Sequence, residues 1–237
     1  MTVPIVPSNC QQCPHYQKSL LGACHHTELA LVEGGKMHQF YRKGQLIFAM
    51  GARAVGLYCV YEGKVKVSNR SADGKEHIIR LAREGDVLGY RSLMSGDTCT
   101  TAATALTDCI VCLVPRPDFF SLLAQNPQFS QSLLRLLARN LGEAEQRLLH
   151  SAYKPVRERV AGALLLLHAA FRPAAASAAY FSIPVSRDDL AALSGTTKET
   201  ASRLLSEFRQ EGLLTTQGSR ISIRGLESLR EVASLYD

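Results

Sequence analysis

Seven cysteines carry the most reactive side chains in this chain of 237 residues, and three of them stand near its start. Cys10 and Cys13 form a Cys-x-x-Cys pair, and Cys24 follows in the same segment. That segment also holds three histidines, His15, His25 and His26. Thiolates hold zinc and iron–sulfur clusters, and imidazoles also bind zinc. A metal or cluster site, thiols that sense oxidants, and plain buried thiols therefore remain three open interpretations, whereas an odd cysteine count without a secretory signal does not predict a disulfide framework.

A second set of polar side chains recurs along one face of a predicted helix near the C-terminus. The spacing places these residues on one side: Thr197, Lys198, Glu199, Ser202, Arg203 and Ser206. Arg203 can donate two hydrogen bonds to guanine O6 and N7, and Glu199 can accept one from cytosine N4. Ser202 is short enough to reach a base edge or a thymine methyl. This combination predicts a face that contacts bases in the major groove of DNA.

The residues around this face predict a helix-turn-helix from Arg187 to Phe208. Ser186 is a suitable N-cap for the first helix, and Gly195 supplies the permissive backbone of the turn. Thr196 or Thr197 would cap the second helix, whose inward stripe is Ala201, Leu204, Leu205 and Phe208. A helical hairpin with a solvated polar face is the alternative interpretation. The segment from Gly212 to Ile223 argues against it, because its Gln217-Gly218 turn predicts a β-hairpin wing in which Arg220 can contact phosphate.

Between about Phe40 and Pro115 the sequence predicts short strands separated by glycines. The predicted strands are Leu57–Tyr61, Lys64–Val67, His77–Leu81, Ala102–Leu106 and Cys109–Val114. Turn signals at this spacing are typical of an antiparallel barrel or sandwich. Metal-dependent enzymes on such barrels need clustered histidines and a carboxylate. Because this stretch contains a single histidine, His77, we do not expect an enzyme.

A long helical pattern runs from Phe129 to about Tyr153, after a short helix predicted for Asp118–Ala124. Alternating steps of three and four residues place one apolar seam along it: Leu134, Leu137, Leu141, Ala144 and Leu148. Leu133 and Leu136 are expected to pack on their own domain. The extra seam predicts a homodimer in which two copies of this helix pair. A further helix is expected from Val156 to Phe171, after the break at Pro155.

Composition supports a packed protein without giving evidence for DNA binding. Hydrophobic residues make up 46% of the chain and charged residues 20%, which predicts a folded core. We expect a cytoplasmic protein without a membrane partner, because the start lacks a signal pattern and the longest apolar run is too short for a span. The net charge is +6, yet the region from Lys154 onward contains 11 Lys and Arg and 9 Asp and Glu, a difference of only 2. Local residues must therefore support any DNA-binding interpretation.

The chain resembles the CRP/FNR family of bacterial regulators over nearly its full length. Three stretches are similar to that family: Tyr41–Phe48 with Gly51, Gly56–Val67, and the helix-turn-helix. The pattern Glu199-x-x-Ser202-Arg203 resembles the FNR branch, whose members bind TTGAT-type half-sites. The CRP branch typically has an arginine before the glutamate, where this chain has Lys198.

The resemblance implies an α+β fold with four parts. These are a Cys/His-rich segment (1–27), a cyclic-nucleotide-binding-like β-barrel or jelly roll (28–128), a long dimerisation helix (129–153) and a winged helix-turn-helix domain (154–237). It also implies a homodimeric transcription regulator that binds double-stranded DNA and contacts RNA polymerase.

The resemblance leaves the effector open between several classes. The family's cyclic-nucleotide cassette has a glutamate and an arginine where this chain has Tyr90 and Thr100, so we do not expect cyclic AMP to bind. FNR-type members hold a [4Fe–4S] cluster with three N-terminal cysteines and one from the barrel. The corresponding cysteines are Cys10, Cys13, Cys24 and Cys112, although family spacing would place the third ligand near Ser19. Cys109 should point to the opposite strand face, and Cys59 and Cys99 are interpreted as small core residues. The alternative effectors are zinc held by the cysteines and histidines, a small ligand, and thiol oxidation in a protein without metal. A small-molecule-binding module with little role in DNA binding is the alternative function.

Overall fold

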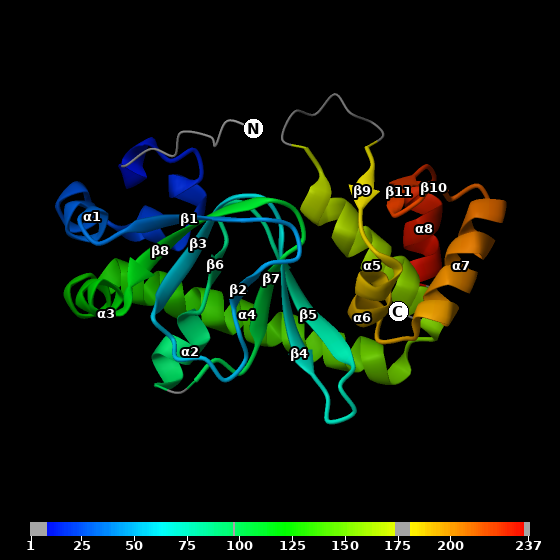
Figure 1. The fold of residues 1–237 in the computed structure, drawn as a ribbon, viewed down its shortest axis with the longest axis horizontal. Helices are drawn as coiled ribbons and strands as arrows, with labels where there is room; N and C mark the ends of the chain where they lie inside the picture. Colours follow the sequence, from blue (N-terminus) through cyan, green and yellow to red (C-terminus); the bar gives the residue numbers. More distant parts are fainter. Residues whose placement is uncertain (1–8, 97, 174–180, 235–237) are drawn as a thin grey trace. The chain divides into compact units, whose positions relative to one another are not determined.

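The computed structural model describes residues 9–96, 98–173 and 181–234, and their fold is shown in Figure 1. The chain divides into two compact units. The first contains residues 1–69 and 82–142, and the second contains residues 70–81 and 143–237. Within the described residues, no helix combines the length and the apolar character that crossing a membrane requires.

Two four-stranded sheets form the predicted β-structure. The strand orders are β1-β8-β3-β6 and β2-β7-β4-β5. The strands are β1 (Met37–Tyr41), β2 (Leu46–Phe48), β3 (Gly56–Glu62), β4 (Val65–Arg70), β5 (Glu76–Ala82), β6 (Val87–Leu88), β7 (Ala102–Ala105) and β8 (Cys109–Pro115). β1 and β3 both pair antiparallel with β8. Because β8 lies between two neighbours, nearly all of its residues are buried.

All five strands expected from the sequence are present. Four of them lie within one residue of their expected bounds, and β4 ends at Arg70, three residues after the expected end at Val67. β1, β2 and β6 were not predicted. Four of the five residues of β1 are exposed, so that strand lacks the alternation of buried and exposed residues by which a half-buried strand is recognised. β2 and β6 contain only three and two residues, too few for any period to appear.

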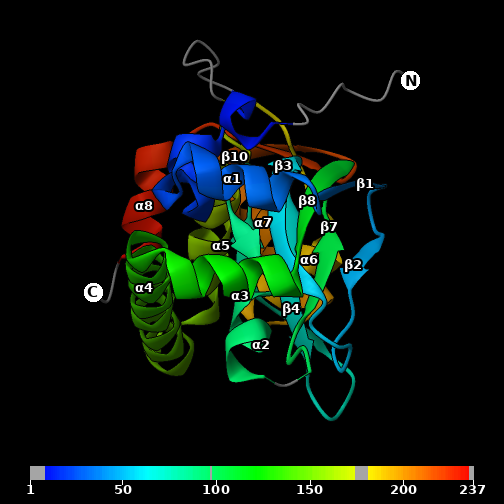
Figure 2. The ribbon, with the colours of Figure 1, turned by 90° about the vertical axis from the view of Figure 1, so that its left-hand side faces the viewer.

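The N-terminal segment and three short helices pack at the barrel. The segment forms 3₁₀ turns at Cys10–Gln12, Tyr16–Lys18 and Leu20–Ala23, followed by α1 (His26–Glu33). α2 is Tyr90–Ser95 and α3 is Arg116–Gln125. Figure 2 shows α1 beside α3. Asn126, which follows α3, fixes this arrangement because its side-chain amide donates to the Ala23 carbonyl (3.0 Å) and to Glu28 (2.7 Å).

The long helix α4 (Pro127–Tyr153) begins two residues before the expected start. Leu133 is buried and Leu136 is partly buried against the core of the first unit, as expected. Leu137 also packs partly against that core, so this residue of the predicted seam is not free. Three residues at seven-residue spacing stay exposed, at 64% for Leu134, 62% for Leu141 and 71% for Leu148. An apolar row is thus left uncovered along α4.

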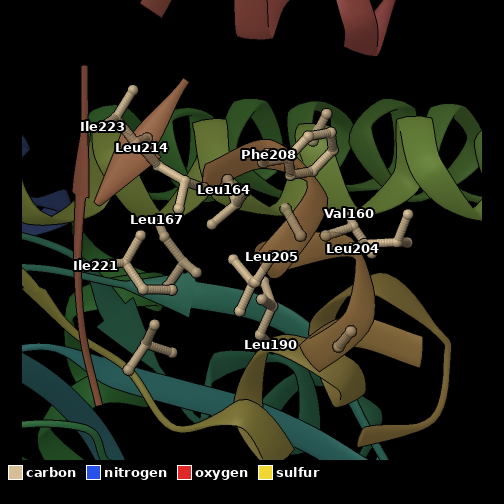
Figure 3. Close-up of a cluster of buried hydrophobic side chains, with 14 of the residues drawn as sticks. Val160, Leu164, Leu167, Leu190, Leu204, Leu205, Phe208, Leu214, Ile221 and Ile223 are labelled. Carbon is tan, nitrogen blue, oxygen red and sulfur yellow. The ribbon is translucent and has the colours of Figure 1, made fainter. Parts of the chain in front are cut away.

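The described residues of the second unit form four more helices and a small sheet of order β10-β11-β9. These elements are α5 (Val156–Phe171), β9 (Ile183–Pro184), α6 (Arg187–Ser194), α7 (Lys198–Gln210), β10 (Leu214–Gln217), β11 (Arg220–Ile223) and α8 (Leu226–Ala233). Side chains from α5, α6, α7 and the β10–β11 hairpin meet in one core, shown in Figure 3. Leu164, Leu190 and Phe208 are fully buried there, and this packing sets the position of α7.

Candidate nucleic-acid interface and thiol cavity

The first helix of the motif, α6, begins where the sequence predicts. The Ser186 hydroxyl oxygen accepts a hydrogen bond from the Asp189 N–H (2.9 Å), and the hydroxyl donates to the Asp189 carboxylate (2.6 Å). This exchange satisfies one of the free N–H groups at the helix start. Leu190 and Ala191 are buried and face the core, so α7 can lie close to α6.

A glycine turn joins α6 to α7. Gly195 has φ +62°, the left-handed conformation that a β-carbon disfavours. The Arg159 guanidinium supports the turn by donating to the Gly195 carbonyl (3.0 Å). Thr197 caps α7, because its hydroxyl oxygen accepts from the Thr200 N–H (3.3 Å). The sequence left Thr196 and Thr197 as equal candidates for this cap.

The two faces of α7 differ as predicted. Ala201, Leu204, Leu205 and Phe208 are buried, and Figure 3 shows three of these side chains directed into the core. The predicted DNA-contacting residues of the helix and its cap lie on the other side. Ser202 is half-buried, and the rest are exposed: Thr197, Lys198, Glu199, Arg203 and Ser206. The structure therefore presents these polar groups together on one free surface of the second unit.

The charged groups of this surface are paired with one another. Lys198 donates to Asp188 of α6 (2.9 Å), and Arg203 pairs with Glu207 one turn further along α7. The pKa of Glu199 is below its usual value, because its own backbone N–H and the Thr197 hydroxyl donate to the carboxylate. Glu199 is thus a carboxylate at neutral pH and can accept hydrogen bonds.

Arg157 of α5 holds the C-terminal half of α7. Its guanidinium donates to both Glu211 carboxylate oxygens (2.8 and 2.7 Å) and to Glu207 (3.3 Å). The guanidinium carbon also lies 4.7 Å from the centre of the Phe208 ring, at cation–π distance. Sequence reasoning missed this residue, because its partners lie about 50 positions away.

The predicted wing is the β10–β11 hairpin. Gln217 pairs with Arg220, and Gly218 between them has φ +57°. Arg187, at the start of α6, donates to the Gly218 carbonyl (3.3 Å) and so ties the tip of the wing to the helix-turn-helix. Arg220 is exposed, as contact with a phosphate requires.

Four cysteines line one cavity in the first unit. The cavity has an empty volume of about 470 Å³, including the solvent at its mouth. Its lining includes Cys10 and Cys13 of the N-terminal segment, Cys59 of β3 and Cys112 of β8. Cys59 was expected in the core. The structure places it partly buried against the core of the first unit and also at the cavity wall, because β3 pairs with β8 in a register that sets Cys59 directly opposite Cys112.

Two basic groups lie beside these thiols. The Lys36 ammonium donates to Cys10 Sγ (3.2 Å), and His38 Nδ1 lies 3.6 Å from Cys112 Sγ. The sequence predicted His77 as the single histidine of the β-region. The structure adds His38, because β1 begins before the stretch where strands were expected. Burial raises the pKa of Cys112 to about 11 and also raises that of Cys10, whose shift Lys36 partly offsets.

The other thiols lie elsewhere. Cys24 is buried but does not line the cavity, and burial raises its pKa to about 12. Cys109 points away from Cys112, as expected, and its thiol donates to the Lys64 carbonyl (3.3 Å). Cys99 is buried, as expected for a core residue. Among the described residues, no three His, Cys, Asp or Glu side chains lie close enough together to hold a metal ion as they stand.

Tyr90 fills the position where the family's nucleotide cassette has its glutamate. The residue is buried, and its hydroxyl accepts a hydrogen bond from the Asn140 amide of α4 (2.6 Å). Thr100, at the position of the cassette arginine, is exposed. Neither residue carries a charge that could pair with a cyclic phosphate.

Comparisons with known proteins match both units of the chain. Residues 38–126 match the cyclic nucleotide-binding domain, and residues 158–232 match the Crp-like helix-turn-helix domain. The cyclic AMP receptor protein of Thermus thermophilus is 31% identical over 82% of this chain and 87% of its own. The anaerobic regulatory protein of Aggregatibacter actinomycetemcomitans is 28% identical over 95% of this chain and 88% of its own. The structure of FixK2 from Bradyrhizobium japonicum is 30% identical, with a TM-score of 0.72 over 83% of this chain and 96% of that one.

The matches agree with the predicted fold, in which antiparallel sheets are followed by a long helix and a C-terminal helix-turn-helix. Members of this family are transcription regulators and not enzymes. The capped turn and two-faced α7 supply the DNA-binding element that such regulators need. The chain belongs to the CRP/FNR family of DNA-binding transcription regulators.

Proposed function

We propose that this regulator works as a homodimer, binds a palindrome of TTGAT-type half-sites, and responds to oxygen or nitric oxide through an iron–sulfur cluster. The observation that supports the DNA-binding part most strongly is the exposed polar face of α7, which stands opposite a fully buried stripe. A helix with this arrangement can enter the major groove with its N-terminal residues nearest the bases.

Base recognition assigns different tasks to the residues of this face. Arg203 leaves Glu207 and donates two hydrogen bonds to guanine, while Glu199 accepts one from cytosine. Ser202 reaches a base edge or a thymine methyl. Thr197, Lys198, Ser206 and Arg220 lie at the edge of the contact and bind phosphates, which fix the helix in the groove without reading sequence.

The exposed row on α4 supports the dimer. Leu134, Leu141 and Leu148 repeat every seven residues, the period of a left-handed coiled coil. Pairing two copies of α4 removes these side chains from water and relates the two copies of α7 by a twofold axis. A twofold protein matches a palindrome whose half-sites lie roughly one helical turn of DNA apart.

The DNA part is tested with fluorescence anisotropy on a labelled TTGAT palindrome. Arg203→Ala should weaken binding by about 1–3 kcal/mol, roughly 5- to 150-fold, and should relax the preference for the contacted base pair. Arg209→Ala is the matched control, since it removes the same charge from an exposed position on another side of α7. Equal losses for the two variants would show that charge alone acts, and would refute base recognition by Arg203.

The donor set supports the effector part. Cys10, Cys13 and Cys112 line one cavity, and thiolates are the usual ligands of iron–sulfur clusters. When bound, such a cluster supplies a centre that reacts with oxygen or nitric oxide. The chain brings thiols of the N-terminal segment close to the cavity wall formed by β3 and β8. A group bound to thiols of the segment and of the wall would attach the segment to the barrel. The name of the anaerobic relative agrees with a role of this kind.

Iron and sulfide analysis of anaerobically purified protein tests this part. We expect both elements in the purified dimer and a loss of DNA affinity after exposure to air. A colourless protein that binds DNA fully in air would refute the iron–sulfur effector but leave DNA recognition standing. Zinc without sulfide would favour the site of cysteines and histidines instead, since His15 also lines the cavity.

A further inference from the structure

The wall of the thiol cavity contains a pair of cysteines fixed by the sheet. Cys59 of β3 and Cys112 of β8 are directly opposite partners in an antiparallel ladder. Side chains in such a pair point to the same face, with their β-carbons roughly 4.5–5.5 Å apart. Both thiols reach the cavity that Cys10 and Cys13 also line. On β3, Cys59 is therefore the residue best placed to reach a group that Cys112 holds.

Cys24 does not line the cavity, although Tyr16 and Leu21 beside it do. Its N–H donates to the Leu21 carbonyl (3.0 Å), and its carbonyl accepts from the Tyr16 hydroxyl (2.6 Å). Its side chain is buried at 3% exposure, outside the set that lines the cavity. This thiol would have to leave its buried position to enter the cavity. No such rearrangement is needed for Cys59.

Two nitrogen-containing side chains lie beside sulfur atoms of the cavity. Lys36 lies against Cys10, and a cation beside a sulfur stabilises its thiolate form. His38 lies beside Cys112 and can donate to its sulfur in the appropriate tautomer. Hydrogen bonds to the sulfurs of a bound cluster help to set its reduction potential.

We infer that Cys59, and not Cys24, joins Cys10, Cys13 and Cys112 as the fourth ligand of an iron–sulfur cluster. The inference rests on the proposed cluster and specifies its ligands. Because no three of these thiols are close enough to bind metal as they stand in the described structure, the site must close on binding. Cys59 and Cys112 are held by the ladder, so the closing movement belongs to Cys10 and Cys13 on the N-terminal segment.

The test compares Cys59→Ala with Cys24→Ala in the full-length protein. Alanine is used because a serine oxygen could itself act as a ligand. After anaerobic reconstitution, iron and sulfide per chain and the visible absorbance of the cluster are measured. Cys59→Ala should lower cluster affinity at least about tenfold, since even residues that only support a metal ligand contribute 10- to 100-fold. Cys24→Ala should keep the wild-type iron and sulfide content.

A second measurement does not depend on whether the variants fold. Alkylation of each cysteine in the wild-type protein, with and without reconstituted cluster, is read by mass spectrometry. Cys59 should be modified in the apo protein and protected in the reconstituted one, whereas Cys24 should react alike in both. Two results would overturn the assignment of Cys59 without affecting the proposed cluster. One is loss of the cluster in Cys24→Ala with retention in Cys59→Ala, and the other is cluster-dependent protection of Cys24 but not of Cys59. A wild-type protein without iron and sulfide overturns the proposed cluster as well.

Discussion

Replacement of Gly195 by alanine tests whether the turn between α6 and α7 sets the position of the recognition helix. At φ +62° an L-residue costs about 1–2 kcal/mol. The added β-carbon would also lie 3.0 Å from the Arg159 guanidinium, which donates to the Gly195 carbonyl. Displacing that group costs about 0.5–1.5 kcal/mol. We expect the two effects together to lower the local stability of α6 and α7 by about 1.5–3.5 kcal/mol.

Hydrogen exchange of the full-length protein measures this loss directly. Amides of α6 and α7 should exchange roughly 10- to 400-fold faster in Gly195→Ala, and DNA affinity should fall with them. Gly162→Ala is the control, because it should change stability in the opposite direction. Gly162 lies inside α5, and nothing stands within 4 Å of the added β-carbon. Alanine should therefore stabilise that helix by about 0.5–1 kcal/mol. If both variants moved exchange in the same direction, or if Gly195→Ala were neutral, the role assigned to the turn would be wrong.

Three further outcomes are expected. Arg157→Ala should lower the melting temperature by an amount equivalent to about 1 kcal/mol, because this partly exposed cation stabilises α7 through surface ion pairs and an aromatic contact. Leu141→Glu should convert the dimer to a monomer in analytical ultracentrifugation, since it places a charge in the exposed row of α4. Burial lowers the pKa of His168 below 6.5, so its stabilising contribution is complete above about pH 6.5 and is lost as the pH falls towards the folded-state value. Thermal unfolding across this pH range should be less pH-dependent in His168→Gln.

The second unit was predictable because its signals are local. The cap at Ser186, the glycine turn and the stripe from Ala201 to Phe208 each depend on residues within one or two helical turns. All of them are found where the sequence places them. Arg157 was not predictable in this way, since its contacts with α7 exist only after α5 and α7 have packed together.

The first unit was predicted less completely, and the misses share a cause. β1 carries His38 but is mostly exposed, so its sequence shows no alternation to recognise. Cys59 lies in a strand whose bounds were correctly expected, yet the identity of its neighbour depends on the register between β3 and β8. Register over that sequence distance is a property of tertiary pairing, which the local pattern of one strand does not encode.

Tyr90 and the thiol cavity together suggest how this chain differs from nucleotide-regulated relatives. Where the family's cassette holds a carboxylate for a ligand, Tyr90 is buried and binds Asn140 of α4 through its own hydroxyl. The barrel is thus linked to the long helix by a hydrogen bond between two side chains of the protein. The cavity lined by four thiols lies between the N-terminal segment and the strands β3 and β8. The strand β3 contacts β8 and also α2, the helix that carries Tyr90. A structural change at the thiols can therefore reach Tyr90, and through it α4, across one strand.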